Sequence, residues 1–310
     1  MRILVGSPIK QKSTVLKEFL IGLDEADKAN CDITYFFVDD NTEEASCKLL
    51  ADFAATHNTI LKKGAELFDV TPYTENSDYQ NHGWKTVNLA KVTAYKNAMI
   101  EHCIKEKYDY LFLVDSDIII DKRTFPQLIA DDVEIVSNVF WNQWKKNGIL
   151  TPQCFYIPDI FVQEKQFNIP YTPEEAAKIR MDNIERMKTP GLHIVDGLGA
   201  CTLMKRSALE KGVNFTEIYN LKIPGEDRPF CVRAGAAGIT LYMDTHFPAY
   251  HCCKEIFLDR VDEYKKEGWK ADMCQVFEPV ETKKKMNFVQ KFIYRVAKKI
   301  VRECKNRYDT

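Results

Sequence analysis

A buried strand that ends in two aspartates constrains this chain most. Residues 110–114 (YLFLV) form an apolar run of strand length, rich in aromatic and branched side chains, and three isoleucines resume the run at 118–120. Asp115 and Asp117 interrupt it, with Ser116 between them. Burying an unpaired carboxylate costs on the order of several kcal/mol. We therefore expect both aspartates to lie at a strand end, facing water or a cation.

The spacing of these two aspartates allows them to share a ligand. Alternate residues of an extended chain point the same way, so both carboxylates can reach one ion. A hard divalent cation that keeps waters and bridges phosphate oxygens suits such a pair. A turn in which Asp and Ser cap the next element is the alternative, and an isolated D-x-D favours that alternative. The surrounding chain has to decide between the two.

The composition is that of an ordinary globular protein. With 310 residues, 45% of them hydrophobic and 28% charged, the chain can bury a large core. No apolar run approaches the ~20 residues that a membrane span needs, and the first residues predict a strand rather than a signal peptide. Ten cysteines without a C-x-x-C pair or zinc-site spacing predict reduced, mostly buried thiols. We therefore expect a cytoplasmic protein.

The net charge of −2 conceals a basic tail. Residues 283–307 carry ten Lys or Arg and one acid, Glu303, so this segment is about +9 and the remainder, −2 minus +9, is about −11. Apolar residues recur in it at helical spacing, which predicts an amphipathic helix that binds an anionic membrane surface on the inner membrane face. A helix docked on the sheet and a solvated tail are the alternatives. No nucleic-acid-binding motif accompanies the tail, so nucleic acid is not an expected partner.

Strands and helices alternate along the first part of the chain. A strand at residues 2–7 ends at Pro8, and a second strand at 31–38 runs into Asp39 and Asp40 before the next helix. This order predicts a doubly wound α/β layer, in which ligands bind beyond the carboxyl ends of the strands. The two acids and the D-x-D then converge on one crevice. A helix-capping role for Asp39 and Asp40 is an equal alternative.

Two lysines lie on a helix predicted over residues 84–104, which precedes the strand at residues 110–114. Lys91 and Lys96 can each pair with a diphosphate in the crevice, or lie on a solvated helix face. Farther on, residues 133–140 predict another strand, and Thr172 predicts the start of a helix that runs to about residue 188.

Acids and histidines in the last third complete the candidates. Gly225 precedes Glu226 and Asp227 at a helix start, where an acid can also simply satisfy the helix dipole. A further strand predicted over residues 239–243 is followed by His251. The chain has no G-x-G-x-x-G fingerprint and no G-K-[ST] loop, which counts against a nicotinamide enzyme or a P-loop ATPase.

The order of these pieces resembles a family 2 glycosyltransferase of the GT-A fold. The motifs that carry the resemblance span most of the chain, in the family's order: Pro8, Asp39-Asp40, Lys96-Asn97, Asp115-Ser116-Asp117, Glu226-Asp227 with Arg233, and His251. The sequence departs from the family at Lys96, where the family usually has Arg, and at Ile118, which stands where a further acid is common. Residues 141–190 match nothing in the family pattern, which leaves the acceptor open.

The resemblance implies an α/β, GT-A-like (Rossmann-like) mixed sheet flanked by helices over residues 1–278. Within it, residues 1–120 would form the nucleotide-sugar half and residues 121–278 the acceptor half, followed by the basic amphipathic tail at 279–310. It also implies a metal-dependent enzyme that moves a sugar from a nucleotide-diphosphate donor to an acceptor hydroxyl, with inversion. The acceptor would be a glycan, a lipid-linked molecule or a protein.

The resemblance assigns the cation to the D-x-D. Asp117 would bind Mn²⁺ or Mg²⁺, and Asp115 would bind it through water or contact the ribose hydroxyls. His251 would be a second protein ligand, with His246 as its rival. A cation held in this way would neutralise the diphosphate that the donor leaves behind.

The remaining roles concern the donor and the base. Pro8 would line the nucleotide site, Asp40 would bond to the nucleotide base, with Asp39 the weaker candidate, and both Lys91 and Lys96 would contact the phosphates. Inversion requires a group that takes the proton of the acceptor hydroxyl, and Asp227 is the candidate. His193 and Asp196 are in reserve for this role.

Two other classes remain open. Sugar nucleotidyltransferases share this kind of sheet, but they usually carry a glycine-rich basic loop after the first strand, and residues 6–12 are only faintly similar to one. A non-catalytic carbohydrate-binding scaffold could keep the fold, but it would have little need for Asp117 and Asp227 together.

Overall fold

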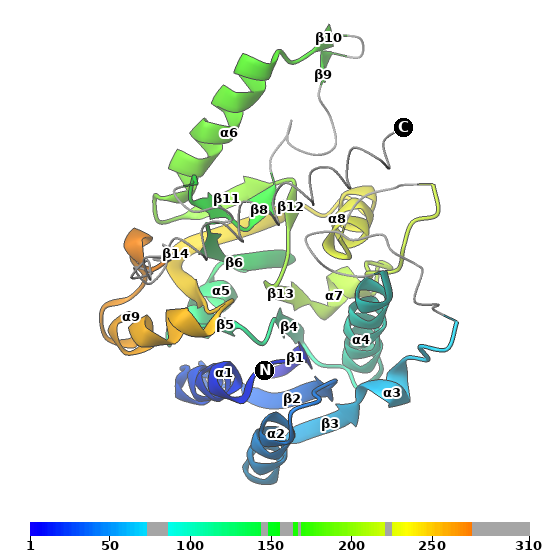
Figure 1. Cartoon of the computed structure of the whole chain (residues 1–310). Coiled ribbons are helices and arrows are strands. Elements are labelled where there is room, and N and C mark those ends of the chain that lie inside the picture. Colours follow the sequence, from blue (N-terminus) through cyan, green and yellow to red (C-terminus); the bar gives the residue numbers. More distant parts are fainter. Residues whose placement is uncertain (73–85, 144–147, 156–163, 167–168, 221–224, 275–310) are drawn as a thin grey trace, which may run out of the picture. The chain divides into compact units, whose positions relative to one another are not determined.

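The computed structural model describes residues 1–72, 86–143, 148–155, 164–166, 169–220 and 225–274 (Figure 1). Within these residues, the main element is a sheet of ten strands. Eight follow the order β11-β14-β6-β13-β4-β1-β2-β3, while β5 pairs with β14 and β7 with β6. The strands are β1 (Arg2–Ile9), β2 (Asp32–Asp39), β3 (Thr59–Lys63), β4 (Tyr110–Val114), β5 (Ile118–Ile119), β6 (Ile135–Asn142), β7 (Thr151–Pro152), β11 (Leu192–Val195), β13 (Cys201–Lys205) and β14 (Leu241–His251).

Helices and short strand pairs surround this sheet. The helices are α1 (Ser13–Glu25), α2 (Glu44–Thr56), α3 (Gly64–Leu67), α4 (Thr86–Lys105), α5 (Thr124–Ala130), α6 (Pro173–Met187), α7 (Arg206–Leu209), α8 (Asp227–Ala236) and α9 (Val261–Glu267), with 3₁₀ turns η1 (Glu255–Arg260) and η2 (Ala271–Cys274). Two further strand pairs join β8 (Cys154–Phe155) to β12 (Gly197–Leu198), and β9 (Glu164–Gln166) to β10 (Ile169–Pro170).

The sheet divides into two halves by strand direction. In the parallel half, β3, β2, β1 and β4 all run the same way, so their carboxyl ends lie at one edge. In the mixed half, β13 is antiparallel to both β4 and β6, β14 is parallel to β6, and β11 is antiparallel to β14. The mixed α/β sheet flanked by helices, expected from the sequence, is therefore confirmed.

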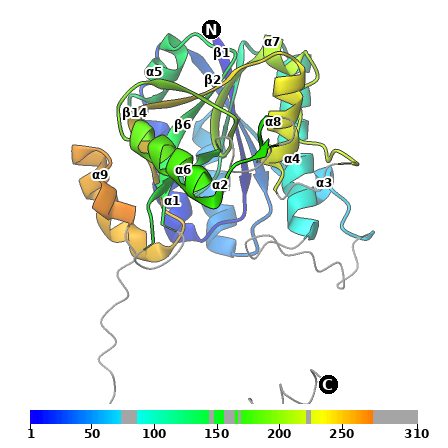
Figure 2. The same cartoon turned by 90° about the horizontal axis from the view of Figure 1, so that it is seen from above.

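The central strands are buried on both faces, which explains their continuous apolar runs. Alternate side chains enter two separate cores. Leu4, Val38 and Leu111 pack in one core with residues of α4 and α8. Ile3 and Phe112 pack in the other with residues of α1, α2 and α5. Figure 2 shows α4 and α8 on one side of the strands and α1 and α5 on the other.

Local capping signals behave as the sequence predicts at α6. Thr172 is the N-cap, its hydroxyl accepts from the Glu175 amide, and the Glu175 carboxylate accepts from the Thr172 amide. At α2 the structure decides against the helix-capping alternative for Asp39 and Asp40. The N-cap position is Glu43, whose carboxylate accepts bonds from the Ser13 amide and the Ser46 hydroxyl. Asp39 and Asp40 are therefore not the caps of this helix.

The last long strand differs from its prediction in length. Its expected end at residue 243 is extended to His251, so His246 lies within β14 rather than after it. The strand pairs with β6 up to Asp244, its register shifts before it pairs with β6 again at Ala249, and its last two residues pair with β5. A polar and proline-containing stretch in the middle of a strand conceals this continuation from the sequence pattern.

The structure bears only in part on three predictions, which concern membrane spans, cysteine thiols and the C-terminal tail. None of the helices in the described ranges is long and apolar enough to cross a membrane. Nine cysteines in these ranges are free thiols, and six of them are buried. The tail at 279–310 and its predicted amphipathic helix lie outside the described residues, so the domain boundary at 278 stays a prediction.

Candidate active site

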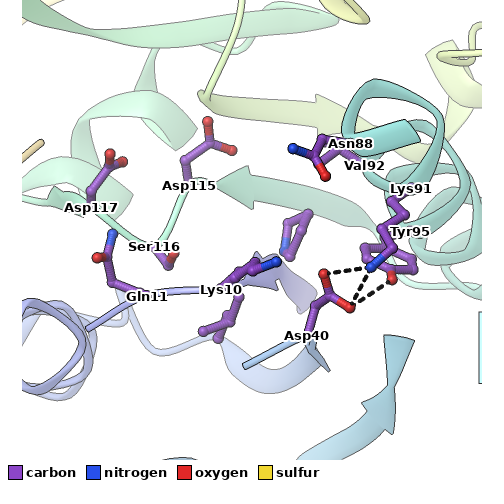
Figure 3. Close-up of a pocket in the computed structure, with 12 residues that line it drawn as sticks. Lys10, Gln11, Asp40, Asn88, Lys91, Val92, Tyr95, Asp115, Ser116 and Asp117 are labelled. Carbon is purple, nitrogen blue, oxygen red and sulfur yellow. Dashed lines mark hydrogen bonds and ion pairs between the residues drawn. The ribbon is translucent and has the colours of Figure 1, made fainter. Parts of the chain in front are cut away.

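A cavity of about 300 Å³ lies beyond the carboxyl ends of β1, β2 and β4 (Figure 3). Its walls come from these strand ends and from the start of α4: Pro8, Ile9, Lys10, Gln11, Asp40, Asn88, Lys91, Val92, Tyr95, Asp115, Ser116 and Asp117. This is the crevice that a doubly wound layer places at its strand ends. It contains five of the residues expected there from the sequence: Pro8, Asp40, Lys91, Asp115 and Asp117.

The D-x-D forms the turn between β4 and β5. The Asp115 amide donates to the carbonyl of Ala200, at 2.9 Å, and the Asp117 carbonyl accepts from the amide of Cys252, at 2.7 Å. The Ile118 amide donates to the Asp115 carbonyl at 3.0 Å. Backbone from both sides therefore holds the turn, and the carboxylates of Asp115 and Asp117 do not cap a helix. They are presented to the cavity.

His251, at the end of β14, faces Asp117. Its Nε2 lies 3.3 Å from Asp117 Oδ2, and its Nδ1 contacts the side-chain oxygen of Asn142. The Asn142 amide nitrogen donates to Gln153 Oε1 at 2.9 Å, so the amide oxygen is the atom turned toward the ring. The ring must therefore carry its proton on Nδ1. In the neutral ring Nε2 then offers a lone pair toward a carboxylate, an arrangement that calls for a shared cation or proton between them.

These residues fit a divalent cation that is only partly held by the protein. Asp117 and His251 converge, and Asp115 stands two residues away. Within the described ranges, no group of three or more His, Cys, Asp or Glu side chains is arranged to hold a metal alone. Mg²⁺ is commonly held by one or two carboxylates, with substrate phosphates and water completing its coordination. The donor set therefore suits a cation that arrives with a phosphate ligand.

The two aspartates of the turn have opposite electrostatic environments. Burial raises the pKa of Asp115 to about 7, Lys96 opposes this rise, and repulsion from neighbouring carboxylates adds to it. Burial also acts to raise the pKa of Asp117, but His251 outweighs it and holds that pKa below its ordinary range. An excess of negative charge therefore surrounds Asp115, and a bound cation would relieve it.

Asp40 and Lys91 form an ion pair on the opposite wall. The Lys91 ammonium lies 3.0 Å from each Asp40 oxygen, and the Tyr95 hydroxyl lies 3.4 Å from Asp40 Oδ1. A Cβ on Gly64 would meet the Tyr95 hydroxyl and Asp40 Oδ1, so the bare backbone at this position makes room for the pair. The pair presents an anion and a cation side by side, a pattern suited to a ligand edge that both donates and accepts.

Asp39 is separated from this wall. Its carboxylate accepts from the Asn41 amide at 3.0 Å and from Lys63 Nζ at 2.5 Å, and its side chain is buried. Burial acts to raise the pKa of Asp39, but these hydrogen bonds outweigh it and hold the pKa below its ordinary range. Asp39 does not line the cavity, and its contacts order the chain after β2.

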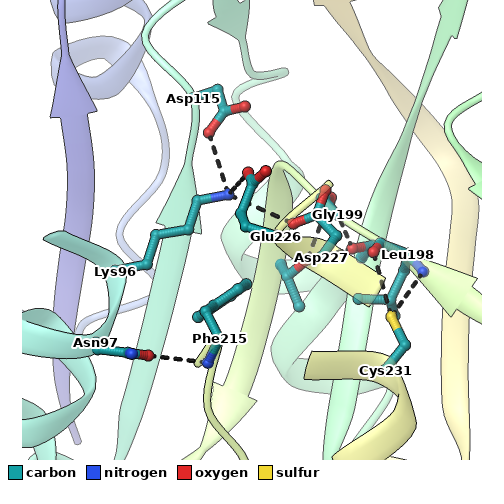
Figure 4. Close-up of polar contacts among 11 residues, drawn as sticks. Lys96, Asn97, Asp115, Leu198, Gly199, Phe215, Glu226, Asp227 and Cys231 are labelled. Atoms are coloured by element: carbon teal, nitrogen blue, oxygen red, sulfur yellow. Dashed lines mark hydrogen bonds and ion pairs between the residues drawn. The ribbon is translucent and has the colours of Figure 1, made fainter. Parts of the chain in front are cut away.

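Lys96 lies at the centre of an acid cluster rather than in the cavity (Figure 4). Its ammonium is 2.9 Å from Glu226 Oε1, 3.4 Å from Asp227 Oδ1 and 3.9 Å from Asp115 Oδ1. Only 2% of its side chain is exposed, and the Phe215 ring lies 5.1 Å from the ammonium. This position argues against the phosphate contact expected from the sequence, because three carboxylates already surround the charge.

Glu226 and Asp227 share Lys96 but differ in their environments. Burial acts to raise the pKa of both. Lys96 outweighs burial at Glu226 and holds that pKa below its ordinary range. At Asp227 burial prevails, repulsion from Glu226 adds to it, and the pKa rises to about 6. Neighbouring acids whose pKa values are pushed apart are a common sign of a proton-transfer site.

The start of α8 places Asp227 in this cluster. Gly225, at φ 89°, turns the chain, Glu226 is the N-cap position without a side-chain cap bond, and Asp227 begins the helix. The amide of Leu198 donates to Cys231 Sγ at 3.4 Å, which ties α8 to β12. A Cβ on Gly199 would meet the Asp227 carboxylate, so only glycine permits this close approach.

The loop that contains Phe215 lies against Lys96 and is held by two polar side chains. Asn97 accepts from the Phe215 amide at 2.8 Å and donates to the Thr216 hydroxyl at 3.0 Å. Arg233 donates to the Thr216 carbonyl at 2.5 Å. The Phe215 ring stacks on Phe230, with centroids 4.6 Å apart. The Asn97 and Arg233 of the sequence motifs therefore support the loop and do not line the cavity.

The reserve candidates are placed elsewhere. The His193 ring on β11 contacts the Thr189 carbonyl and the Thr245 hydroxyl, at 3.0 and 3.1 Å. The His246 Nδ1 lies 2.5 Å from Asp244 Oδ2, so this histidine pairs with Asp244 rather than with Asp117. Asp196 lies between β11 and β12 and does not line the cavity.

Several site residues were missed from the sequence. Lys10, Gln11, Asn88, Val92 and Tyr95 line the cavity, yet only their proximity to Pro8 and Lys91 along the chain could have indicated them. Asn142 lies 109 residues from the histidine that it orients, and no local pattern connects the two.

Comparison with known proteins yields structural similarity only. No protein-family model matches the chain, and no curated protein matches its sequence. The structure is similar to residues 1–349 of S. aureus TarS, with 16% identity over 81% of this chain and 60% of that one, at a TM-score of 0.46. The TarS complex with UDP-GlcNAc gives 16% identity over 81% and 58%, at a TM-score of 0.45.

The mannosyltransferase PcManGT from Pyrobaculum calidifontis, in complex with GDP-Man and Mn²⁺, is similar at 13% identity over 82% of this chain and 57% of that one, at a TM-score of 0.46. The chain thus spans less than two thirds of the length of these structures. At this identity the similarity concerns the fold alone.

Proposed function

We propose that this chain is a cation-dependent glycosyltransferase that moves a sugar from a nucleotide-diphosphate donor to an acceptor hydroxyl. The observation that carries the proposal is the connection between the cavity and the acid cluster. Asp115 lines the cavity, its Oδ1 lies 3.9 Å from Lys96 Nζ, and the same ammonium lies 3.4 Å from Asp227 Oδ1. A cation-binding turn and a candidate base thus share one charged centre.

The cavity suits the nucleotide. Its volume of about 300 Å³ is at the lower end of ordinary ligand pockets. Asp40 would accept a hydrogen bond from the nucleotide base, and Lys91 beside it would donate to a neighbouring oxygen of the ligand or remain paired. Pro8 provides an apolar wall. Asp39 has no part in this contact, because its carboxylate is already bonded to Asn41 and Lys63.

Asp117 and His251 would hold the cation, with Asp115 close enough to act through water or on the ribose. A bound Mn²⁺ or Mg²⁺ stabilises the negative charge that develops on the departing diphosphate. The residues around it contribute rigidity, because the Asp117 carbonyl is fixed by the Cys252 amide and the His251 ring by Asn142.

Asp227 would act as the general base. The acceptor oxygen forms a bond to the anomeric carbon, the bond from that carbon to the diphosphate oxygen breaks, and the diphosphate keeps the electron pair. The acceptor proton passes to Asp227. A pKa raised to about 6 suits this role near neutral pH, because the group is ionised yet still basic enough to take a proton. A single displacement of this kind inverts the configuration.

A thermal-unfolding experiment tests the proposal against its rivals. UDP, GDP, UTP and GTP are added with Mn²⁺ or with a chelator. We expect a nucleoside diphosphate to raise the unfolding midpoint only when Mn²⁺ is present. At 100 times its Kd, such a ligand adds about 2.7 kcal/mol of stability. Protection by triphosphates alone would favour a sugar nucleotidyltransferase, and no effect of any nucleotide would leave a carbohydrate-binding scaffold.

The acceptor and the place of action rest on the sequence alone. A glycan, a lipid-linked molecule and a protein are equal candidates as acceptor. Contact of residues 283–307 with an anionic membrane surface stays a prediction, as does a cytoplasmic location, because these basic residues lie outside the described part of the chain. Vesicle sedimentation at rising salt, with and without residues 280–310, tests the membrane contact.

A further inference from the structure

Two lysines five positions apart on α4 occupy contrasting places in the site. Lys91 lines the cavity and pairs with Asp40. Lys96 does not line the cavity, and its ammonium is enclosed by Glu226, Asp227 and Asp115. Of the three carboxylates around Lys96, Asp115 is the one that lines the cavity. The charge of Lys96 therefore acts first on the carboxylates around it, and through Asp115 on a ligand in the cavity.

We infer that Lys96 is a positioning residue for the base Asp227 and not a ligand of the donor phosphates. This inference rests on the proposed function. The ammonium lies 3.4 Å from one oxygen of Asp227, and the missing side chain of Gly199 leaves room for the other oxygen of the same carboxylate. Lys96 thereby fixes the direction of the base and favours its charged form before the acceptor arrives.

Glu226 explains how Lys96 can remain buried when Asp227 is protonated. The ammonium keeps its shorter contact with Glu226, at 2.9 Å, after Asp227 has taken the acceptor proton. A buried ammonium that lost its only partner would be strongly destabilised. With two adjacent acids, one stays ionised as the counterion and the other exchanges the proton. The neighbouring Phe215 ring, 5.1 Å from the ammonium, restrains its position further.

The test separates donor affinity from turnover. Lys96→Met alone leaves three carboxylates uncompensated, so the informative variant is Lys96→Met combined with Glu226→Gln, which keeps the net charge of the cluster. Glu226→Gln alone is its matched control, and Lys91→Met is the donor-side control. Circular dichroism and the unfolding midpoint show that each variant is folded. Affinity for UDP and GDP with Mn²⁺ is measured by calorimetry. Turnover is the release of nucleoside diphosphate from UDP-glucose, UDP-GlcNAc and GDP-mannose, with water as acceptor.

We expect the double variant to keep nucleotide affinity within about twofold of the Glu226→Gln control while its turnover falls by about tenfold or more, since a positioned base contributes about 10²–10⁴-fold. Lys91→Met should weaken nucleotide binding instead. A tenfold loss of affinity in the double variant, or turnover equal to that of the control, would overturn the inference and leave the proposed function standing.

Failure of the proposed function has a different signature. A wild-type protein that binds neither UDP nor GDP with Mn²⁺ contradicts the proposed function, and the inference with it. A wild-type protein that binds a nucleotide but releases none from the three donors contradicts Asp227 as the base, and therefore any role of Lys96 toward it.

Discussion

The two halves of the sheet build their parts of the site by different means. In the parallel half, Pro8, Asp40 and Asp115 lie at or directly after a strand, and the common strand direction brings them to one cavity. In the mixed half, Asp227 begins a helix after a glycine turn, and His251 ends a strand whose register shifts. Backbone topology places the first group, whereas side-chain contacts place the second.

This difference indicates where each kind of substitution should act. The cavity is organised by strand ends, so a change there should alter what binds and leave the framework intact. The acid cluster is organised by charge: Glu226, Asp227 and Asp115 share one buried ammonium. A change in the cluster should therefore alter turnover and the pH dependence of stability more than it alters binding.

The largest expected effect is that of Asp227→Asn. Asn cannot accept the acceptor proton but can still occupy the first turn of α8, so turnover should fall by about 10²–10⁴-fold while nucleotide affinity stays nearly unchanged. Donor hydrolysis and calorimetry of UDP or GDP with Mn²⁺ measure the two quantities. Glu226→Gln, one residue away, is the matched control: it removes the counterion of Lys96 but leaves the carboxylate that takes the proton, so it should reduce turnover less.

If Asp227→Asn retained its turnover, the mixed half would no longer differ from the parallel half in supplying the base. The base would then have to be sought elsewhere, and His193 and Asp196 are poor replacements. His193 is bonded to Thr189 and Thr245 at the edge of the sheet, and Asp196 does not line the cavity. Retention of configuration, which needs no such base, would become the preferred mechanism.

The second effect concerns Asp117 in the parallel half. Asp117→Ala should reduce Mn²⁺-dependent nucleotide affinity by about 100-fold or more, because a direct ligand contributes more than outer-shell groups, whose loss costs about 10–100-fold. The unfolding midpoint without metal should change little, since the carboxylate contributes little to the cores. Calorimetry with and without Mn²⁺ measures the loss. Equal affinity of the variant and the wild-type protein would show that the cation, if bound, lies elsewhere.

A smaller effect is expected at Asn142, which orients His251 from β6. Asn142→Leu removes the acceptor for the Nδ1 proton, so the ring can turn or change tautomer, and Mn²⁺-dependent nucleotide affinity should fall by about 10–100-fold. Asn142→Asp keeps an acceptor at this position and is the matched control. The ¹⁵N shifts of the His251 ring report the tautomer directly. An unchanged tautomer in Asn142→Leu would show that Asn142 does not set it.

The sequence predicts the parallel half well because its signals are local. Apolar runs mark strands that are buried on both faces, and polar residues directly after them mark the edge where ligands bind. The sequence also allows a prediction that Asp39 and Asp40 have different surroundings, since successive side chains of an extended chain point in opposite directions. Asp39 is accordingly buried against Lys63, while Asp40 lines the cavity.

The mixed half was less predictable because its contacts join distant parts of the chain. Asn142 and His251 are 109 residues apart, and Lys96 and Asp227 are 131 apart. One signal in the sequence does distinguish the two lysines of α4. At 3.6 residues per turn, Lys91 and Lys96 lie about 140° apart around their helix, so both cannot face one crevice. Helical periodicity therefore requires that only one of them lines the cavity, although it does not indicate which.

The smallest effect is a pH dependence of stability that distinguishes Asp115 from Asp117. The pKa of Asp115 is raised to about 7 in the folded protein, so the fold retains a proton that the unfolded chain releases near pH 4. Between these values, rising pH therefore removes stability. Asp115→Asn cannot ionise, so it should raise the unfolding midpoint at pH 8 by a few degrees more than at pH 5.5. The gain is small because 40% of the side chain is exposed.

Asp117→Asn is the matched control with the opposite sign. The pKa of Asp117 lies below its ordinary range, so its stabilising charge is fully present above about pH 4 and is lost only as the pH falls further. Asp117→Asn should therefore lower the midpoint at both pH values, and ionisation of the aspartate itself adds no difference between pH 5.5 and pH 8. Thermal unfolding without metal at the two pH values measures both variants. A pH-independent gain in Asp115→Asn would show that Asp115 is already ionised at pH 5.5. Lys96 would then outweigh the burial that acts to raise the pKa of Asp115.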